Sequence, residues 1–281
     1  MLLGGPKSDQ AALSGGSWQP LLPLANLQDP RLRKVARSTD LALASTKFFI
    51  DLGGVETFRA IVAGPTNLRR SFGYRIRNYE DETYAAVGYD SGWITTATRI
   101  DYGTLPYGAP YWWDGLVPYP DTTRSGPSII HIFDENVAAR FWSIEIDADG
   151  NPDGFVDIGR LFMAGHYVPS LNYGYDRNSF SYADNTLRAT TLNGASIERE
   201  RVNPREFQFG LDLLPEAEAF GVLLPFVRET GFANEVFVIP DPDDATHMQD
   251  RSFFAKIRQM DALTQAMFGR ASTGFQLREI F

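Results

Sequence analysis

Alternating hydrophobic and polar positions in the first half of the chain predict short β-strands. A regular alternation places Trp142, Ile144 and Ile146 on one face of a strand and polar side chains on the other. Similar runs, separated by Gly and Pro turns, occupy residues 47–52, 58–63, 74–79 and 155–163. Residues 84–119 are instead crowded with Tyr, Trp, Gly and Pro, which predicts a long loop region. Because no convincing helix lies between the runs, the pattern favours a β-sandwich.

The second half of the chain predicts a smaller module that combines strands with one prominent helix. Residues 207–213 show the cleanest alternation in the sequence and predict a half-buried strand. The helix is expected to begin at Pro215, to be kinked by Pro225 and to end before Gly231. Further strand candidates follow at residues 235–239, 252–258 and 274–280. The expected fold class is mainly β, with a β-sandwich followed by a smaller α+β module.

These patterns divide the chain into three predicted parts. Residues 1–45 are rich in Gly, Pro, Ser and Leu and lack clean periodicity, so we expect an extended N-terminal arm that becomes ordered against something else. Residues 46–170 are expected to form the sandwich. A polar stretch at residues 172–203 marks a boundary, and residues 171–281 are expected to form an α+β assembly module.

Composition and charge narrow the classes of partner. The chain of 281 residues is 43% hydrophobic and 22% charged, which is typical of a globular protein. A net charge of -9 argues against nucleic acid as a main partner, because binding phosphates requires a basic face. No window approaches the roughly 18 apolar residues that a membrane helix needs, and no signal peptide is recognisable. We therefore expect no membrane insertion and synthesis in the cytoplasm.

Candidate catalytic chemistry is sparse. The chain has no cysteine, which excludes disulfides, thiolate catalysis and cysteine-bound zinc. Nucleophile-elbow, phosphate-loop and dinucleotide-binding motifs are missing, and the three histidines lack metal-ligand spacing. Paired carboxylates for glycan hydrolysis leave no readable signal among 35 acids. The sequence therefore predicts no enzyme, no catalytic residue and no cofactor, and a cell-wall or glycan hydrolase is the least favoured alternative.

One acidic loop is a weak candidate for a calcium site. Oxygen-bearing side chains alternate there at Asp147, Asp149, Asn151 and Asp153. An EF-hand interpretation fails, because Pro152 stands where the loop needs Gly and Ile158 where it needs a bidentate Glu. A β-turn with Pro152 and Gly154 at favourable positions is the preferred interpretation. No metal is therefore predicted, although the four residues remain candidates.

Aromatic residues between positions 93 and 119 form one candidate surface for a ligand or a partner. Trp93, Trp112 and Trp113 could stack on sugar rings or on the side chains of a partner protein. The alternative is a loop that folds over the edge of the sandwich and buries its own aromatic side chains. Burial and a protein interface are together favoured over a glycan site.

Two stretches resemble structural tail proteins of long-tailed bacteriophages. Residues 139–146 read A-R-F-W-S-I-E-I, and residues 151–162 read N-P-D-G-F-V-D-I-G-R-L-F. Two further pieces fit this resemblance, namely F-I-D-L-G at residues 49–53 with Y-D-S-G at residues 89–92, and R-S-F-F-A-K-I-R at residues 251–258. The early D-L-G segment and the A-R-F segment also resemble the galactose-binding, discoidin-type jelly-roll sandwich. The resemblance covers most of the chain after residue 20.

The resemblance implies assembly rather than catalysis. Such tail-tip proteins, the distal tail or baseplate components, form rings of identical subunits where the tail tube meets the baseplate hub. The chain is therefore expected to be a virion component, assembled in the host cytoplasm, whose partners are further copies of itself and other tail proteins. A jelly-roll does not by itself establish sugar binding. The alternative function is a host-surface glycan-binding module of the tail.

Overall fold

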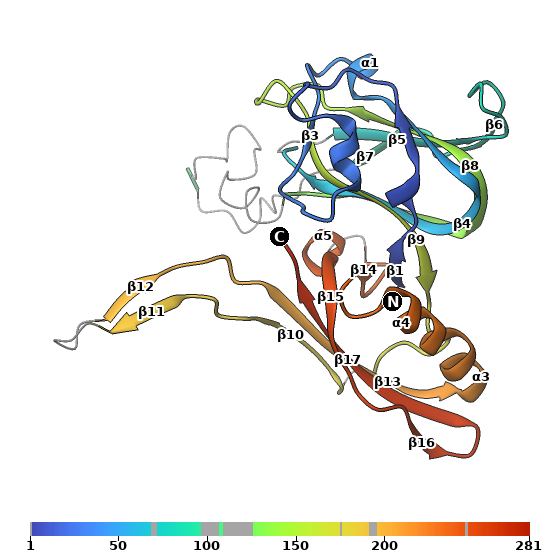
Figure 1. The fold of residues 1–281 in the computed structure, drawn as a ribbon, viewed down its shortest axis with the longest axis vertical. Coiled ribbons are helices and arrows are strands. Elements are labelled where there is room, and N and C mark those ends of the chain that lie inside the picture. The colour runs from blue at the N-terminus through green and yellow to red at the C-terminus, as the bar shows by residue number, and fades with distance from the viewer. Residues whose placement is uncertain are drawn as a thin grey trace. The chain divides into compact units, whose positions relative to one another are not determined.

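The chain is mainly β and divides into two compact units (Figure 1). This computed structural model describes residues 2–68, 72–96, 107–108, 126–174, 176–190, 196–244 and 247–281. Pro6–Gly165 form one unit, called here the sandwich unit. Met1–Gly5 and His166–Phe281 form the other, called here the α+β unit. The predicted fold class, a β-sandwich followed by a module with one prominent helix, is confirmed.

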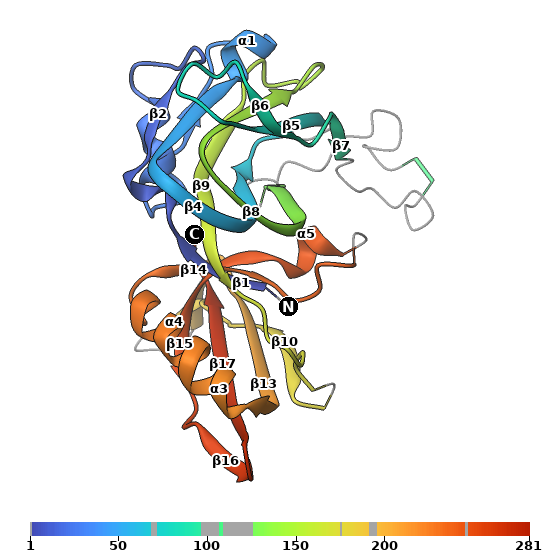
Figure 2. The ribbon, with the colours of Figure 1, turned by 90° about the vertical axis from the view of Figure 1, so that its right-hand side faces the viewer.

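Two long strands build the sandwich unit. β4 (Phe48–Thr66) and β8 (Ile129–Asp147) each contain 19 residues and curve along their length (Figure 2). The shorter strands are β2 (Ala12–Ser14), β3 (Ala36–Arg37), β5 (Phe72–Tyr79), β6 (Val87–Asp90), β7 (Ile94–Thr96) and β9 (Asp157–Tyr167), of which β9 runs on into the α+β unit.

Because β4 and β8 bend together, their two halves belong to different layers. In one layer the first half of β4 pairs with β2 on one side and with the second half of β8 on the other. The second half of β8 also pairs with β5, and β5 pairs in turn with β6 and β7. In the other layer the second half of β4 pairs with the first half of β8 and with β9, which also pairs with β3. All these pairings are antiparallel.

The core of the sandwich unit lies between the two layers. Phe48, Ile144 and Ile76 come from one layer, whereas Ile61 and Ile158 come from the other, and all five are fully buried in one cluster. Within an uninterrupted stretch of strand the cluster takes every second residue, as Trp142, Ile144 and Ile146 of β8 show. The alternation in the sequence therefore predicted the buried face correctly.

The structure corrects the expected break at Gly53-Gly54. The runs at residues 47–52 and 58–63 belong to one strand, β4, in which the pairing with β8 shifts register between Asp51 and Glu56. Gly53 has a φ of 75°, a left-handed conformation that glycine adopts without steric cost. The glycines therefore form a bulge and not an end. The expected loop at residues 84–119 also contains β6 and β7, while most of its remainder lies outside the described residues.

The N-terminal segment differs from the predicted separate arm at residues 1–45. Residues 6–45 belong to the sandwich unit, and they contain η1 (Ser8–Gln10), η2 (Leu24–Gln28), α1 (Leu43–Thr46), β2 and β3. A fully buried arginine, Arg160 on β9, holds this segment with a 2.7 Å ion pair to Asp9 and a hydrogen bond to the carbonyl of Leu27. Hydrogen bonds made by irregular segments have no periodicity, so the sequence pattern could not show them.

The main sheet of the α+β unit has the strand order β10-β13-β17-β15-β14-β1, and β16 pairs with β17. Its strands are β1 (Leu2–Pro6), β10 (Asn178–Tyr182), β13 (Arg205–Pro215), β14 (Glu235–Ile239), β15 (Phe253–Met260), β16 (Thr264–Met267) and β17 (Arg270–Glu279). The predicted strands at 207–213, 235–239, 252–258 and 274–280 correspond to β13, β14, β15 and β17.

The predicted helix covers one face of this sheet. It consists of α3 (Glu216–Glu218), a π-helical turn η3 (Ala219–Leu223) and α4 (Leu224–Thr230). The π turn ends two residues before Pro225, whose missing N–H group cannot donate to the preceding turn of an α-helix. Ala219, Leu223 and Val227 pack against apolar side chains of the sheet, including Phe209. A short helix, α5 (Met248–Arg251), precedes β15.

A two-stranded ribbon extends from the sheet beyond β10 and β13 (Figure 1). It consists of β11 (Leu187–Thr190) and β12 (Ser196–Arg199), paired antiparallel, and every residue of both strands is exposed. The polar stretch at residues 172–203, predicted as a boundary, therefore contains β10 and this ribbon. Within the described residues, no helix has the length and apolar character needed to cross a membrane.

Candidate functional site

Trp93 lies exposed on the outer face of the sandwich unit, just before β7. Its side chain rests over Gly73 of β5, since a Cβ added at Gly73 would lie 3.4 Å from Cε3 of the indole. The same Cβ would lie 3.4 Å from Cβ of Asp147, which is paired with Gly73 across β5 and β8. The residue is 45% exposed. Because Gly73 has no side chain, the indole of Trp93 can pack against the backbone of β5 at the surface.

A network of paired charges lies on the same face of the sheet. Arg75, two residues after Gly73, donates from Nε to Oδ1 of Asp90 at 2.8 Å and forms a second bond to the other carboxylate oxygen. Arg77 lies 3.3 Å from Asp90 and 3.4 Å from Glu145. Glu145 is also paired with Lys47 at 2.8 Å. Hydrogen bonding from Arg75 lowers the pKa of Asp90 to about 2, so this carboxylate stays ionised at neutral pH.

The combination of an exposed indole with fixed hydrogen-bonding groups is suited to binding a polar ring. The apolar face of a sugar stacks on an aromatic ring, while bidentate and charged groups hydrogen-bond to hydroxyls at its edge. Of the three predicted tryptophans the structure describes Trp93 alone, because Trp112 and Trp113 lie outside the described residues. Trp93 and the charge network are called the Trp93 face below.

The acidic loop that follows β8 is folded as a turn. Its candidate ligands are Asp147, Asp149, Asn151 and Asp153. Asp147 accepts a hydrogen bond from the N–H of Asp149, and the amide of Asn151 donates to the carbonyl of Phe155 at 2.9 Å. Asp153 accepts a 3.0 Å hydrogen bond from Asn67. Gly150 and Gly154 have positive φ angles, as tight turns require. Across the described ranges, no group of three or more acidic or histidine side chains is arranged to hold a metal ion.

Two histidines, His131 and His247, have identified structural partners. His131 is buried between two phenol groups, with Nε2 3.1 Å from the hydroxyl of Tyr89 and Nδ1 3.4 Å from that of Tyr74. Burial lowers the pKa of His131 to about 4, so the ring is neutral at pH 7. His247 is exposed and lies 2.9 Å from a carboxylate oxygen of Asp244. Both arrangements are consistent with ordinary structural histidines.

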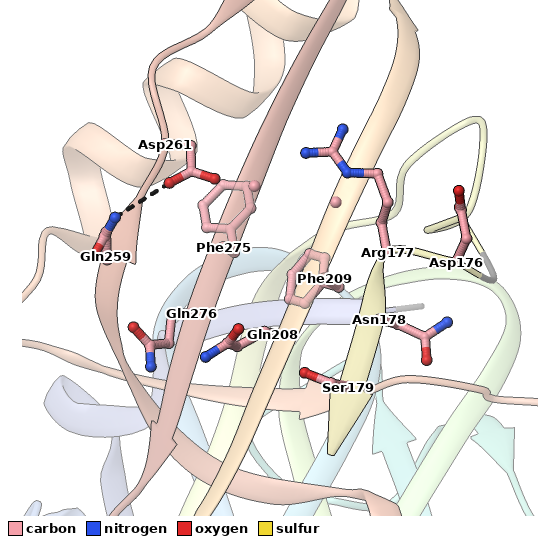
Figure 3. A pocket seen from close by; sticks show the side chains of 12 residues that line it. Asp176, Arg177, Asn178, Ser179, Gln208, Phe209, Gln259, Asp261, Phe275 and Gln276 are labelled. Carbon is pink, nitrogen blue, oxygen red and sulfur yellow. Dashed lines mark hydrogen bonds between the residues drawn. The ribbon is translucent and has the colours of Figure 1, made fainter. Parts of the chain in front are cut away.

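A polar groove lies on the open face of the α+β sheet, opposite the helix. It has a volume of about 420 Å³ and crosses β10, β13, β17 and β15 (Figure 3). The helix packs against the face that carries Phe207, Phe209 and Leu277. The alternate residues Gln208 and Gln276 therefore point to the other face and line the groove.

Sequence reasoning missed this groove, although part of its signal was visible. The alternation in residues 207–213 puts Gln208 and Gly210 on the polar face of β13, which predicts a half-buried strand but no site. The opposing residues Gln276 and Gly274 lie on β17, more than sixty positions further along the chain, and only the pairing of the strands brings the two sets together.

The residues that carry the resemblance to phage tail proteins have structural roles in the sandwich unit. Arg140 forms a bidentate ion pair with Asp51, at 2.6 and 2.9 Å, which joins β8 to β4. A Cβ at Gly159 would lie 2.5 Å from the carbonyl oxygen of Leu32, so this position has room for glycine alone. Arg160 is the buried arginine that holds the N-terminal segment. Arg140, Gly159 and Arg160 therefore hold this sandwich together, whereas Glu145 and Asp90, which belong to the same stretches of resemblance, lie in the charge network of the Trp93 face.

Comparisons with known proteins give distant structural neighbours. No family model matches the sequence, and no curated protein matches it. The family 32 carbohydrate-binding module (CBM) of C. perfringens NanJ, solved in complex with galactose, is 14% identical with a TM-score of 0.39, covering 59% of this chain and 100% of that chain. The CBM32 of AlyQ, solved with 4,5-unsaturated mannuronic acid, is 14% identical with a TM-score of 0.36, covering 54% and 92% respectively.

A third neighbour is a much longer enzyme. The Ruminococcus gnavus GH29 fucosidase, solved in complex with fucose, is 10% identical with a TM-score of 0.37; the alignment covers 58% of this chain and 27% of the fucosidase chain. At such low identities and TM-scores, the alignments carry no argument about ligand or activity. None of these three structures is a phage tail protein, so the resemblance to tail proteins stays a prediction.

Proposed function

We propose that this chain is a non-enzymatic binding protein whose sandwich unit binds a glycan on the Trp93 face. The observation that carries the proposal is the exposed indole of Trp93, held over Gly73 beside the pair formed by Arg75 and Asp90. Exposure of one aromatic ring is ordinary by itself, but a ring held next to paired charges offers both a stacking surface and hydrogen-bonding groups, as a saccharide requires.

The charges of the Trp93 face favour an uncharged, hydroxyl-rich ligand. The network sets Arg75, Arg77 and Lys47 against Asp90 and Glu145, and Asp147 adds a third carboxylate next to Gly73. The three positive and three negative charges cancel, so the face attracts neither an anion nor a cation strongly. Paired guanidinium and carboxylate groups still have lone pairs and N–H groups that can bond to hydroxyls. Because the groups hold one another in place, little side-chain entropy is lost when a ligand binds.

The absence of enzymatic activity is part of the proposal. A general acid or base must have a pKa suited to proton transfer and must reach the substrate. His131 is buried and its pKa is lowered to about 4, while Asp90 is held ionised by Arg75 with a pKa of about 2. Neither group is poised to exchange a proton near neutral pH. Turnover of any polysaccharide by the purified chain would contradict this part.

Retention on bacterial surface polysaccharide coupled to beads tests the glycan site. The full chain is expected to be retained, and Trp93→Ala should lose that retention because the stacking surface is removed. Phe268→Ala is a matched control, since Phe268 is a fully exposed aromatic residue on the α+β unit. Equal retention of the wild type and Trp93→Ala would rule out the Trp93 face as the site.

A second candidate function is that of a structural component of a phage tail tip. It is favoured by the ribbon of β11 and β12, whose residues are all exposed, because an isolated two-stranded ribbon is marginal in water and gains stability by docking onto another chain. The partners expected from the resemblance are copies of this chain in a ring, the tail tube and the baseplate hub. Mass spectrometry of purified particles tests this candidate, and absence of the chain from the virion would exclude it.

A further inference from the structure

The open groove of the α+β unit has a floor made by two facing glycines. Gly210 of β13 lies opposite Gly274 of β17, and neither has a positive φ, so the backbone conformation does not demand glycine at either position. Glycine inside a strand costs stability relative to residues with side chains. A reason for glycine must therefore be sought in the space above the sheet.

The side chains of Arg177 and Asp261, which carry opposite charges, occupy that space. A Cβ at Gly210 would lie 3.0 Å from Nε of Arg177, and a Cβ at Gly274 would collide with a carboxylate oxygen of Asp261. Figure 3 shows the two side chains on opposite sides of the groove. Asp261 is fixed at its backbone, because its N–H donates to the carbonyl of Gly274 and its own carbonyl accepts from Thr273. The glycines thus leave a shallow bed that these two side chains occupy, with a fixed acceptor on one side and a guanidinium on the other.

A row of hydrogen-bonding side chains crosses the four strands beside this bed. Strand pairing aligns Ser179, Gln208, Gln276 and Gln259 in that order. Neighbouring strands are about 4.8 Å apart, so the row spans roughly 14 Å, the length of a short oligosaccharide. Among the described residues, the amides of Gln208 and Gln276 have no side-chain partner and are available to a ligand. A primary amide both donates and accepts hydrogen bonds, as a sugar hydroxyl does.

The charges of the groove disfavour an ionic ligand. Arg177 is already paired with Asp212 at 2.6 Å, which offsets its attraction for an anion. Asp176 and Asp261 add negative charge to the lining, so a phosphate or a carboxylate would be repelled. The two acids belong to opposite sides of the groove and do not converge on one point as cation ligands must (Figure 3).

We infer that this groove is a second carbohydrate site, independent of the Trp93 face, which binds an uncharged saccharide. The sugar rings lie over the row of side chains beside this bed, next to Arg177 and Asp261. Their hydroxyls exchange hydrogen bonds with the amides of Gln208 and Gln276. The aromatic residues among its described lining, Phe209 and Phe275, are buried, so the binding proposed here uses hydrogen bonds rather than stacking.

Saturation-transfer NMR and calorimetric titration of the full chain test the inference. The probes are a panel of neutral di- and trisaccharides together with sialylated and sulfated counterparts. Each titration is made in the Trp93→Ala background, which removes the site of the proposed function. Binding that remains therefore belongs to the groove, and the two proposals can be tested separately. The groove variant is the double substitution Gln208→Ala with Gln276→Ala, and Gln265→Ala, a glutamine on β16 outside the groove, is the matched control.

A neutral saccharide is expected to bind in the Trp93→Ala background, and the double substitution should weaken it about 10-fold or more, because two hydrogen-bonding amides are lost. Asp261→Ala should weaken it as well, and Gln265→Ala should not. Three results would each overturn the inference: no probe binds, the sulfated or sialylated forms bind better, or affinity is unchanged by the double substitution. Self-association that the double substitution abolishes would instead make the groove an interface between copies.

Discussion

Protonation of His131 should make the stability of the sandwich unit depend on pH. The imidazole is buried, its nitrogens face the hydroxyls of Tyr89 and Tyr74, and the nearest acid with an effect on its pKa is Asp134. Burial dominates and lowers the pKa of His131 to about 4. The pKa of Tyr74 is raised to about 12, also by burial, so that phenol stays neutral throughout.

The sign and size of the effect follow from proton linkage. A histidine in the unfolded chain has a pKa of about 6.5, so the unfolded state binds more protons between about pH 4 and pH 6.5. The contribution to stability is therefore fully present above that window and is lost as the pH falls through it. With a folded pKa of about 4, the free energy of unfolding should drop by about 2 kcal/mol between pH 7 and pH 5 from this one residue.

Urea unfolding monitored by tryptophan fluorescence measures this drop selectively. All five tryptophans lie within residues 6–165, so their fluorescence reports on the sandwich unit. The reference is His131→Gln, which keeps hydrogen-bonding groups near Tyr89 and does not titrate. The wild type should lose about 2 kcal/mol more than His131→Gln between pH 7 and pH 5. The same pH dependence in both proteins would show that protonation of His131 does not cause the loss of stability.

Two further substitutions test the packing of the sandwich unit, both by thermal unfolding monitored by fluorescence. Gly159→Ala should destabilise the sandwich unit by about 2 kcal/mol, because the new Cβ would lie 2.5 Å from the backbone oxygen of Leu32. Gly54→Ala is the control, because its new Cβ would meet nothing within 4 Å. Equal effects of the two substitutions would contradict the close packing described at Gly159. Asp9→Ala should cost about 2 kcal/mol, because it leaves the fully buried Arg160 without its carboxylate. A change near zero would show that this ion pair does not hold the N-terminal segment.

Local patterns in the sequence predicted the elements and the class of fold. Alternation identified the core faces of β8 and β13, and the placement of Pro215, Pro225 and Gly231 identified the helix and its irregular middle. These features depend on neighbours within a few positions, so a sequence alone can show them. The continuity of β4 through Gly53 escaped prediction, because glycine marks bulges and strand ends alike.

The candidate sites depend on pairings between distant segments, which local patterns do not encode. Trp93 was recognised as a candidate from its residue type, but its bed at Gly73 and its neighbours Arg75 and Asp90 required the register of β5 with β6 and β7. The groove required the register of four strands whose residues span about a third of the chain. The resemblance to tail proteins indicated residues such as Arg160 that prove to be structural.

A glycan array probed with the purified full chain is the most direct test of carbohydrate binding. The wild type should bind reproducibly to one or more glycans, Trp93→Ala should lose part of that signal, and Phe268→Ala should lose none. A blank array, or identical signals from the wild type and from a protein that carries both Trp93→Ala and the double glutamine substitution, would contradict the proposed binding.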